Sequence, residues 1–301
     1  MASKVPPDSP EGRSFQVFAD KVAEFSNGRL TVDVFPSEQL GGTEVTLEQL
    51  QAGLIHVYPE DSGFLQKWVP EVKWIGSEFI FDDRAHWSRF LETELVTSWF
   101  GKVEELAGIS IIGKESDFVR GPYNVQASTR PWRNLSEMSG IKLRSHNNQL
   151  AVDIWTHLGA DVRVLDWTDV YQSLDTGIVE AANSPIGLVE PMRFYEVAPH
   201  IIRHDAKSQG IAFMVNTKAY RGLDAELRDA VDRAQQAAGA YSAELMEKFA
   251  AESIERMTAT GVEYYEIDNA DFIERMAGFY GDLESEGTLP EGFLDAVAST
   301  R

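Results

Sequence analysis

Hydrophobic residues along the first 60 positions recur at the spacings of helices and strands. Residues 14–26 predict a helix, because four apolar side chains fall on one helical face: Phe15, Phe18, Val22 and Phe25. Residues 30–35 alternate like a strand, a second helix is expected between Gly42 and Gly53, and residues 54–58 predict a buried strand. Strands and helices that alternate over so short a stretch predict a parallel sheet with helical crossovers.

The same alternation continues along the rest of the chain. Further strands are predicted at residues 109–112, 141–144, 161–164, 178–182 and 211–216. Residues 223–258 carry a helical pattern much longer than the typical globular helix of about 11 residues. The sequence therefore predicts two α/β domains that this long helix braces. The first comprises residues 1–120 with about 210–250, and the second comprises residues 121–209 with about 251–301.

Composition narrows the classes of function. The chain has 301 residues, with 48 acidic and 27 basic side chains and a net charge of −21. A surface this negative argues against nucleic acid and anionic lipid as partners, although a local positive cleft can still hold an anion. There is no cysteine, which excludes disulfides and thiolate chemistry. No run of 18 apolar residues occurs, and the polar, proline-rich start is not a signal peptide. The protein is therefore either cytoplasmic or exported by a leader that precedes this numbering.

Arg144 is the central candidate for ligand binding. It ends the predicted strand at residues 141–144, and Asn147 or Asn148 can cap the helix that follows. A guanidinium at the carboxyl end of a strand, beside a helix N-terminus, suits an anionic ligand in an α/β protein. Its planar fork matches a carboxylate. The alternative is an ion pair with a glutamate that ties down a loop, and these few residues alone favour that alternative.

Other strand ends supply groups that complement this cation. Trp167 follows one strand, Asn183 and Ser184 follow another, and Glu60-Asp61 end the strand of the first domain. Together they suit a small polar molecule with a carboxylate at one end and hydrogen-bond donors at the other. Trp167 is alternatively a core residue. Glu60 and Asp61 are alternatively a general acid and base, but neighbouring strand residues face opposite sides, which favours a structural or ligand-accepting role for Glu60.

Metal and cofactor chemistry have little support. His200 and His204 are four residues apart, but the residues between them predict a strand and no third ligand is near. The motifs of nucleophile-elbow hydrolases, dinucleotide-binding proteins, P-loop proteins and zincins are all missing. We expect neither a metal nor a cofactor.

Four segments in order resemble the DctP-type substrate-binding proteins of tripartite ATP-independent periplasmic (TRAP) transporters. The segments are Phe18 to Gly42, Gly140-Ile141-Lys142-Leu143-Arg144, Leu158 to Gly177, and Glu180 to Val197. The resemblance implies a periplasmic-binding-protein-like fold, in which two α/β domains close around a small organic acid in the cleft between them. It implies that Arg144 forms the salt bridge, that Asn147 and Glu60 contact the ligand, and that Trp167 forms an aromatic wall. It also implies a monomeric, non-enzymatic periplasmic receptor that delivers a carboxylate to membrane subunits.

The sequence departs from the family pattern at three places. Ser184 stands where the family has a ligand-binding asparagine, and Arg120 or Tyr123 takes the place of a further arginine. A strand expected before Ser3 is largely missing, so we expect a leader and part of that strand to precede residue 1. Sugar acids, aromatic acids, dicarboxylates and zwitterions all remain possible ligands. Two other functions stay open: an enzyme with Glu60 or Asp61 as its base, and a ligand sensor for a signalling receptor.

Overall fold

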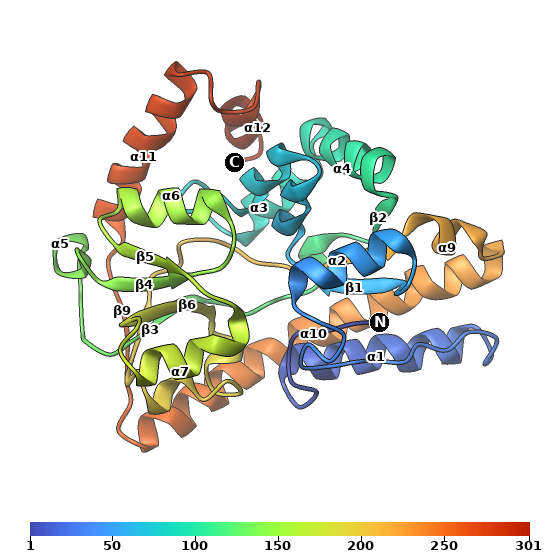
Figure 1. Ribbon diagram of the computed structural model, residues 1–301, viewed down its shortest axis with the longest axis horizontal. Coiled ribbons are helices and arrows are strands. Elements are labelled where there is room, and N and C mark those ends of the chain that lie inside the picture. The colour runs from blue at the N-terminus through green and yellow to red at the C-terminus, as the bar shows by residue number, and fades with distance from the viewer. The chain divides into compact units, whose positions relative to one another are not determined.

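A computed structural model describes residues 1–301, which form two compact units (Figure 1). Unit 1 comprises Met1–Val72, Val96–Arg120 and Gln209–Phe249, and unit 2 comprises Lys73–Leu95, Gly121–Ser208 and Ala250–Arg301. The sequence interpretation assigned all of residues 1–120 to one domain, whereas residues 73–95 lie here with unit 2. The reason is local packing within unit 2, because Trp74 and Phe90 both contact Phe293 near the C-terminus.

Unit 1 contains a three-stranded sheet in the order β1-β8-β2. Its strands are β1 (Val57–Glu60), β8 (Ala212–Asn216) and β2 (Ile109–Ile112). Both β1 and β2 pair antiparallel with β8. The predicted parallel sheet with helical crossovers is therefore wrong for the hydrogen-bonded neighbours of unit 1. A strand from far along the chain lies between the two that sequence proximity would have paired.

Unit 1 also contains several helices, some of which contact β8. They include α1 (Pro10–Phe25), α2 (Thr43–Ala52), α4 (Glu94–Ala107), which starts in unit 2, α9 (Thr217–Gly222) and the 3-10 helices η1 (Ser62–Lys67) and η3 (Glu115–Asp117). Ser9 caps α1 by accepting a hydrogen bond from the amide of Gly12 at 3.0 Å. The rings of Phe15 and Phe18 then lie 6.0 and 4.9 Å from that of Phe213 on β8. The strand predicted at residues 30–35 is reduced to one bridge between Ala2 and Phe35.

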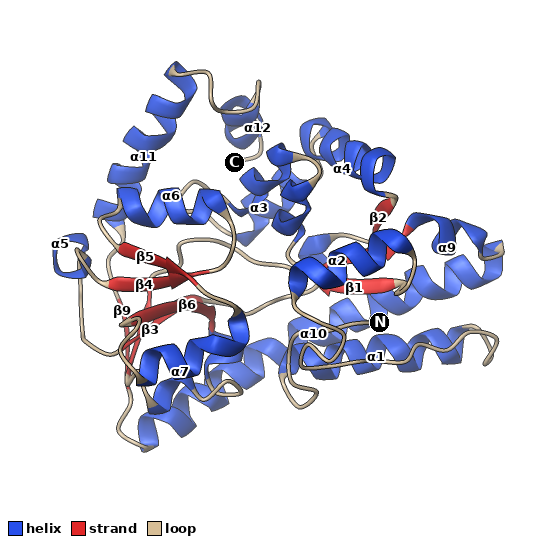
Figure 2. Cartoon of the chain, in the orientation of Figure 1, coloured by secondary structure: helices blue, strands red, loops and turns tan.

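Unit 2 contains a six-stranded mixed sheet in the order β5-β4-β6-β3-β7-β9 (Figure 2). Its strands are β3 (Asn124–Ser128), β4 (Lys142–Ser145), β5 (Asp161–Val164), β6 (Ala181–Pro185), β7 (His200–Arg203) and β9 (Glu263–Glu266). β4 is parallel to β5 and β6, whereas β3 is antiparallel to β6 and β7. The start of β3 therefore lies beside the carboxyl ends of β4 and β6, at the same end of these strands.

Unit 2 contains an aromatic core and several helices, some of which pack on this sheet. They are α3 (Arg84–Leu91), α5 (Leu135–Met138), α6 (Gln149–His157), α7 (Val170–Asp175), α8 (Ile186–Val189), α11 (Ala270–Ser285) and α12 (Phe293–Ser299), with the 3-10 helices η2 (Pro70–Gly76), η4 (Trp167–Asp169) and η5 (Phe194–Glu196). α6 packs on β4 and β5, and α7 packs on β6. Phe79 contacts Trp155 of α6 and Phe272 of α11, at ring separations of 6.2 and 5.4 Å.

Two strands begin three residues later than the sequence indicated. The predictions were residues 54–58 and 178–182, and the strands found are Val57–Glu60 and Ala181–Pro185. Leu54 is 76% exposed and Ile178 is 54% exposed, so each belongs to the turn after a helix and not to the sheet. The shift places Glu60 inside β1, and Asn183 and Ser184 inside β6, instead of just beyond the strands.

The long helix is confirmed as α10 (Ala225–Ala259), a single helix of 35 residues, and the boundary between the units falls within it, after Phe249. Its buried positions are mostly small or polar: Ala230, Ala234, Gln235, Ala238, Ser242, Ala250 and Ser253. A Cβ added to Gly239 would lie 3.0 Å from the carbonyl oxygen of Asp117. α10 therefore packs closely on the backbone before Arg120, and its larger buried apolar residues are Val231, Met246 and Met257.

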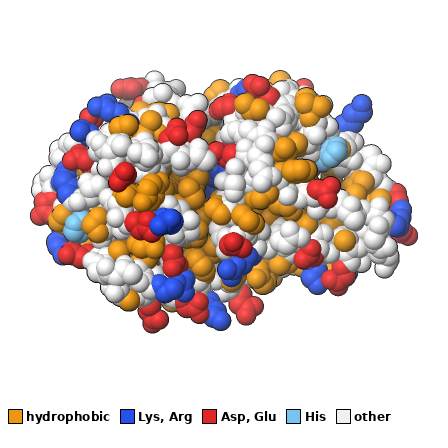
Figure 3. Space-filling view, turned by 60° about the horizontal axis from the view of Figure 1, so that its bottom comes forward, with side chains coloured by type: hydrophobic (Ala, Val, Ile, Leu, Met, Phe, Trp, Pro, Cys, Tyr) orange, Lys and Arg blue, Asp and Glu red, His pale blue; other side chains and the backbone are white.

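Acidic side chains do not gather in a single patch on the one face of the molecule that is shown in space-filling form (Figure 3). On the face drawn in Figure 3, Asp and Glu side chains are scattered among basic and apolar ones. No helix combines the length and the hydropathy that a membrane span requires.

A glycine comparison tests the close packing of α10. Gly239→Val should lower the free energy of unfolding by about 1–3 kcal/mol more than Gly278→Val, because only the first side chain meets neighbouring backbone. Gly278 is also inside a helix but has nothing within 4 Å of an added Cβ, so both variants share the helix-propensity change. Urea denaturation followed by circular dichroism measures the difference. Equal losses in the two variants would show that the contact between α10 and Asp117 tolerates a side chain at position 239.

Candidate functional site

Arg144 lies near the carboxyl end of β4 with its guanidinium oriented by two neighbours. Its Nε donates a hydrogen bond to the carbonyl oxygen of Leu165 at 3.0 Å. Its Cζ lies 5.3 Å from the centre of the Trp167 ring, a cation–π distance. The residue is only 6% exposed. The surrounding backbone and indole therefore hold the guanidinium in one orientation in a desolvated setting, where charge interactions are strong.

Local sequence explains why Trp167 reaches this position. It is the first residue of η4, directly after the loop that follows β5, and its ring meets Phe194 edge-on at 5.2 Å. After β4, the side chain of Asn148 caps α6 by accepting a hydrogen bond from the amide of Ala151 at 3.2 Å. Asn147 is exposed. The capping role thus belongs to Asn148, and the side chain of Asn147 lies at the surface.

Strand register separates Ser184 from Asn183. Arg144 pairs with Ala182 across the β4–β6 ladder, so Ser184, two residues on, faces the same side of the sheet as Arg144. Asn183 faces the opposite side. There its Oδ1 accepts a hydrogen bond from Nε2 of Gln126 at 3.1 Å, and Oε1 of Gln126 accepts one from Nε1 of Trp132 at 2.8 Å. Asn183 therefore belongs to a polar network on the other face of the sheet.

Tyr123 lies just before β3, at the edge where β4 and β6 end. The guanidinium of Arg203 stacks on its ring, with Cζ 3.9 Å from the ring centre. Arg203 in turn bonds to Asp205 at 2.6 Å and lies 3.6 Å from Glu266. Asp205 and Glu266 thus compensate the charge of Arg203. The sequence analysis singled out neither Arg203 nor these two carboxylates.

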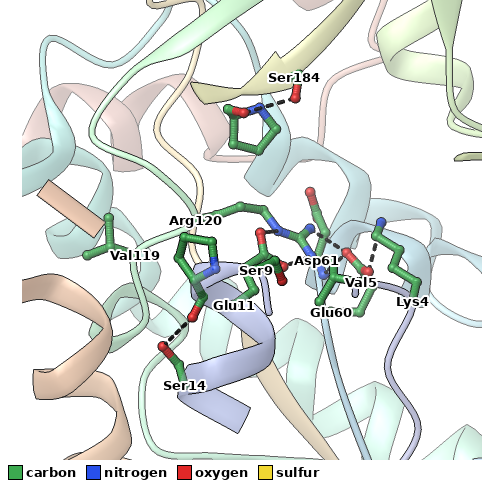
Figure 4. A network of polar contacts seen from close by, with 12 residues as sticks. Lys4, Val5, Ser9, Glu11, Ser14, Glu60, Asp61, Val119, Arg120 and Ser184 are labelled. Atoms are coloured by element: carbon green, nitrogen blue, oxygen red, sulfur yellow. Dashed lines mark hydrogen bonds and ion pairs between the residues drawn. The ribbon is translucent and has the colours of Figure 1, made fainter. Parts of the chain in front are cut away.

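Unit 1 contributes a buried network of charges around Arg120 (Figure 4). The Nε and Nη2 atoms of Arg120 donate to the two carboxylate oxygens of Glu11, at 3.1 and 3.2 Å. Nη1 donates to Oε1 of Glu60, and Nζ of Lys4 pairs with Oε2 of Glu60 at 2.8 Å. The two glutamates are fully buried, and Arg120 is 4% exposed. These contacts tie the end of β1 to α1 and to the N-terminal segment.

This network fixes the charge of Glu60. Burial disfavours its ionised form, but the positive charges of Arg120 and Lys4 outweigh that effect and hold the pKa of Glu60 well below its usual range. A carboxylate held in this way is a weak base at neutral pH. The structure therefore gives no support to Glu60 as a catalytic base, and Arg120 directs its fork at two protein carboxylates.

The remaining candidates have structural surroundings. Asp61 caps η1, because its Oδ1 accepts a hydrogen bond from the amide of Gly63 at 2.7 Å. His204 is buried, which lowers its pKa to about 3, and its Nδ1 accepts a hydrogen bond from the amide of Ala206. No group of three or more His, Asp or Glu side chains is arranged to hold a metal ion.

The sequence interpretation missed residues that hold the buried network of unit 1 and the polar network of unit 2. Lys4, Glu11 and Gln126 were not singled out, and their contacts span from 56 to 109 residues of chain. The one local signal was Glu11 next to Pro10 at a helix start, where an acidic residue is ordinarily a solvated N-terminal charge.

The fold class is that of the two-domain periplasmic binding proteins, as the sequence predicted. The chain belongs to the DctP family: the family model described as "Bacterial extracellular solute-binding protein, family 7" matches residues 1–286. The resemblance found in the sequence is thereby confirmed, and the chain is a solute-binding protein of the kind that serves TRAP transporters. This is a family of transport binding proteins and not of enzymes.

Relatives and solved structures agree with this assignment. A solute-binding protein of Roseobacter denitrificans is 25% identical over 85% of this chain and 77% of its own length. The 2,3-diketo-L-gulonate-binding periplasmic protein of Escherichia coli is also 25% identical, over 88% of this chain and 80% of its own length. A TRAP solute-binding protein of Actinobacillus succinogenes, solved with bound L-galactonate, has 23% identity and a TM-score of 0.89, and the match covers 100% of this chain and 98% of that one.

Removing the central cation of unit 1 tests the buried network. Arg120→Ala should lower the free energy of unfolding by about 3–5 kcal/mol, because Glu11 and Glu60 would lose a shared buried counter-charge. Arg29→Ala is the matched control, since Arg29 pairs with Asp224 and Glu226 at the exposed surface and should matter little. Chemical denaturation at pH 7 measures both. A loss in Arg120→Ala no greater than in the control would contradict the structural role.

Proposed function

We propose that this protein is a periplasmic receptor that captures a sugar acid and delivers it to the membrane subunits of a TRAP transporter. The observation that carries the proposal is the buried guanidinium of Arg144, held by Leu165 and Trp167 at the end of β4. The family assignment supports the transport role. The protein acts as a monomer and performs no catalysis on its ligand.

Arg144 recognises the carboxylate through charge-assisted hydrogen bonds. The bond from Nε to Leu165 directs the guanidinium, and each hydrogen bond to a charged group is worth about 1.5–3 kcal/mol. Because the side chain is nearly buried, it is already desolvated before the ligand arrives. Arg144 therefore loses little hydration on binding, and the ligand carboxylate adds charge-assisted hydrogen bonds to it.

The neighbouring groups suit the hydroxyl-bearing body of a sugar acid. Trp167 offers an aromatic face, and Ser184 lies on the same side of the sheet as Arg144. Asn147 and Tyr123 complete the ligand-facing set of unit 2. Glu60 and Arg120 shape the end of β1, and Asn183 supports β6 from its other face through Gln126. Structural relatives with bound L-galactonate, β-D-galacturonate and L-fuconate support a sugar acid as the ligand class.

A substitution of Arg144 tests the assignment directly. Arg144→Ala should weaken the binding of the sugar acid by at least tenfold, because the carboxylate loses its charged partner. Arg163→Ala is the control, since Arg163 pairs with Arg144 in the β4–β5 register but is exposed and bonds to Asp161. Isothermal titration calorimetry measures both affinities. An unchanged affinity in Arg144→Ala would refute the proposed site.

The ligand is identified by a thermal-shift screen of D-galacturonate, D-glucuronate, L-galactonate and L-fuconate, each beside its neutral parent sugar or alcohol. A ligand at 100 times its dissociation constant adds about 2.7 kcal/mol to the free energy of unfolding. Stabilisation by an acid but not by its neutral counterpart supports the proposal. Conversion of the acid, detected by mass spectrometry, would instead favour an enzyme.

A further inference from the structure

Glu115 is a buried carboxyl group that the proposed binding site does not use. It starts η3 in unit 1 and is 5% exposed. Its Oε1 accepts a long hydrogen bond of 3.4 Å from the amide of Ser62, and its Oε2 is buried without a hydrogen-bond partner. An ionised carboxylate in such surroundings would be poorly solvated.

The charges around the end of β1 do not balance. Four carboxyl groups gather there, namely Glu11, Glu60, Asp61 and Glu115, and the buried network supplies two cations, Lys4 and Arg120. If all six groups were ionised, the sum would be −4 + 2 = −2. The cations contact Glu11 and Glu60 directly. Burial nevertheless raises the pKa of Glu11 as well as that of Glu115, so the surplus is not confined to one pair of acids.

A proton on Glu115 removes part of this surplus. Burial, followed by the negative charge of Asp61, raises the pKa of Glu115 to about 8, while Ser62 and the positive charge of Arg120 act in the opposite direction. On the helix that carries Glu115, Asp117 accepts a hydrogen bond from the amide of Lys114. Asp61 caps η1 and is half-buried, so it is the better solvated of the two acids.

We propose that Glu115 is a positioning residue that carries a proton at neutral pH and thereby holds the Asp61–Gly63 turn at the end of β1. The amide of Ser62 is bound by Glu115, and the amide of Gly63 is bound by Asp61, so the two acids together fix this turn. Loss of the proton places two negative charges against each other beside it. The turn then loosens at alkaline pH.

The direction of the pH effect on stability follows from linkage. The folded state binds the proton more tightly than the unfolded state, whose glutamate titrates near its usual value of 4.5. Stability from this group is therefore fully present below about pH 4.5 and is lost as the pH rises toward 8. Glu115→Gln mimics the protonated form and removes this dependence.

Thermal unfolding of the full chain tests the stability effect. The melting temperature of Glu115→Gln minus that of the wild type should increase steadily between pH 5.5 and 8.5. Glu247→Gln removes the same charge from an exposed site of α10, and its difference should stay constant over this range. A Glu115→Gln difference that also stays constant would overturn the proposal.

Carbon-13 NMR of glutamate carboxyl groups tests the proton itself. One resonance should titrate with a midpoint near 8 and be missing in Glu115→Gln. Asp61→Asn keeps an oxygen to cap η1 but removes the neighbouring charge, so the midpoint should move down. If every glutamate titrates below pH 6, the proposal fails, whether or not the Gln variant folds.

Discussion

The hydrogen bond from Nε of Arg144 to the carbonyl of Leu165 is the constraint on which the proposed recognition depends. It joins the end of β4 to the segment after β5, and it directs the guanidinium toward the face that Ser184 shares. Without it, a long side chain with four rotatable bonds would lose conformational entropy whenever a ligand bound. Because this hydrogen bond and the indole of Trp167 already hold the side chain, its conformational entropy is lost during folding and not on ligand binding.

Unit 1 uses charge in a different way. Arg120 and Lys4 are committed to Glu11 and Glu60, so this half of the protein supplies compensated charges that hold backbone segments together. Such a buried network contributes little net stability compared with apolar packing, but breaking one member is costly. Its value is geometric, because it sets where β1 ends. The neighbouring acids Asp61 and Glu115 lie outside that compensation, which is why protonation becomes the available route to neutrality.

Sequence patterns located Arg144 because a short alternation, a charged strand end and a capping asparagine are all local features. The long helix was predictable for the same reason. The position of β8 between β1 and β2 was not, since strand order depends on partners about 100 residues apart or more. Likewise, adjacency in sequence grouped Asn183 with Ser184, whereas the pleat sends them to opposite faces. Arg120 looked like a candidate for the ligand because its partners, Glu11 and Glu60, are distant in the chain.

The place of β8 also bears on how the chain reaches its native state. The chain passes between the units five times, after residues 72, 95, 120, 208 and 249, so neither unit corresponds to a continuous fragment. The sheet of unit 1 has no central strand until residues 212–216 have been synthesised. A growing polypeptide therefore stays without that sheet through two thirds of its synthesis. This late closure is confined to unit 1, since β3 to β7 of the other sheet are all complete by residue 203.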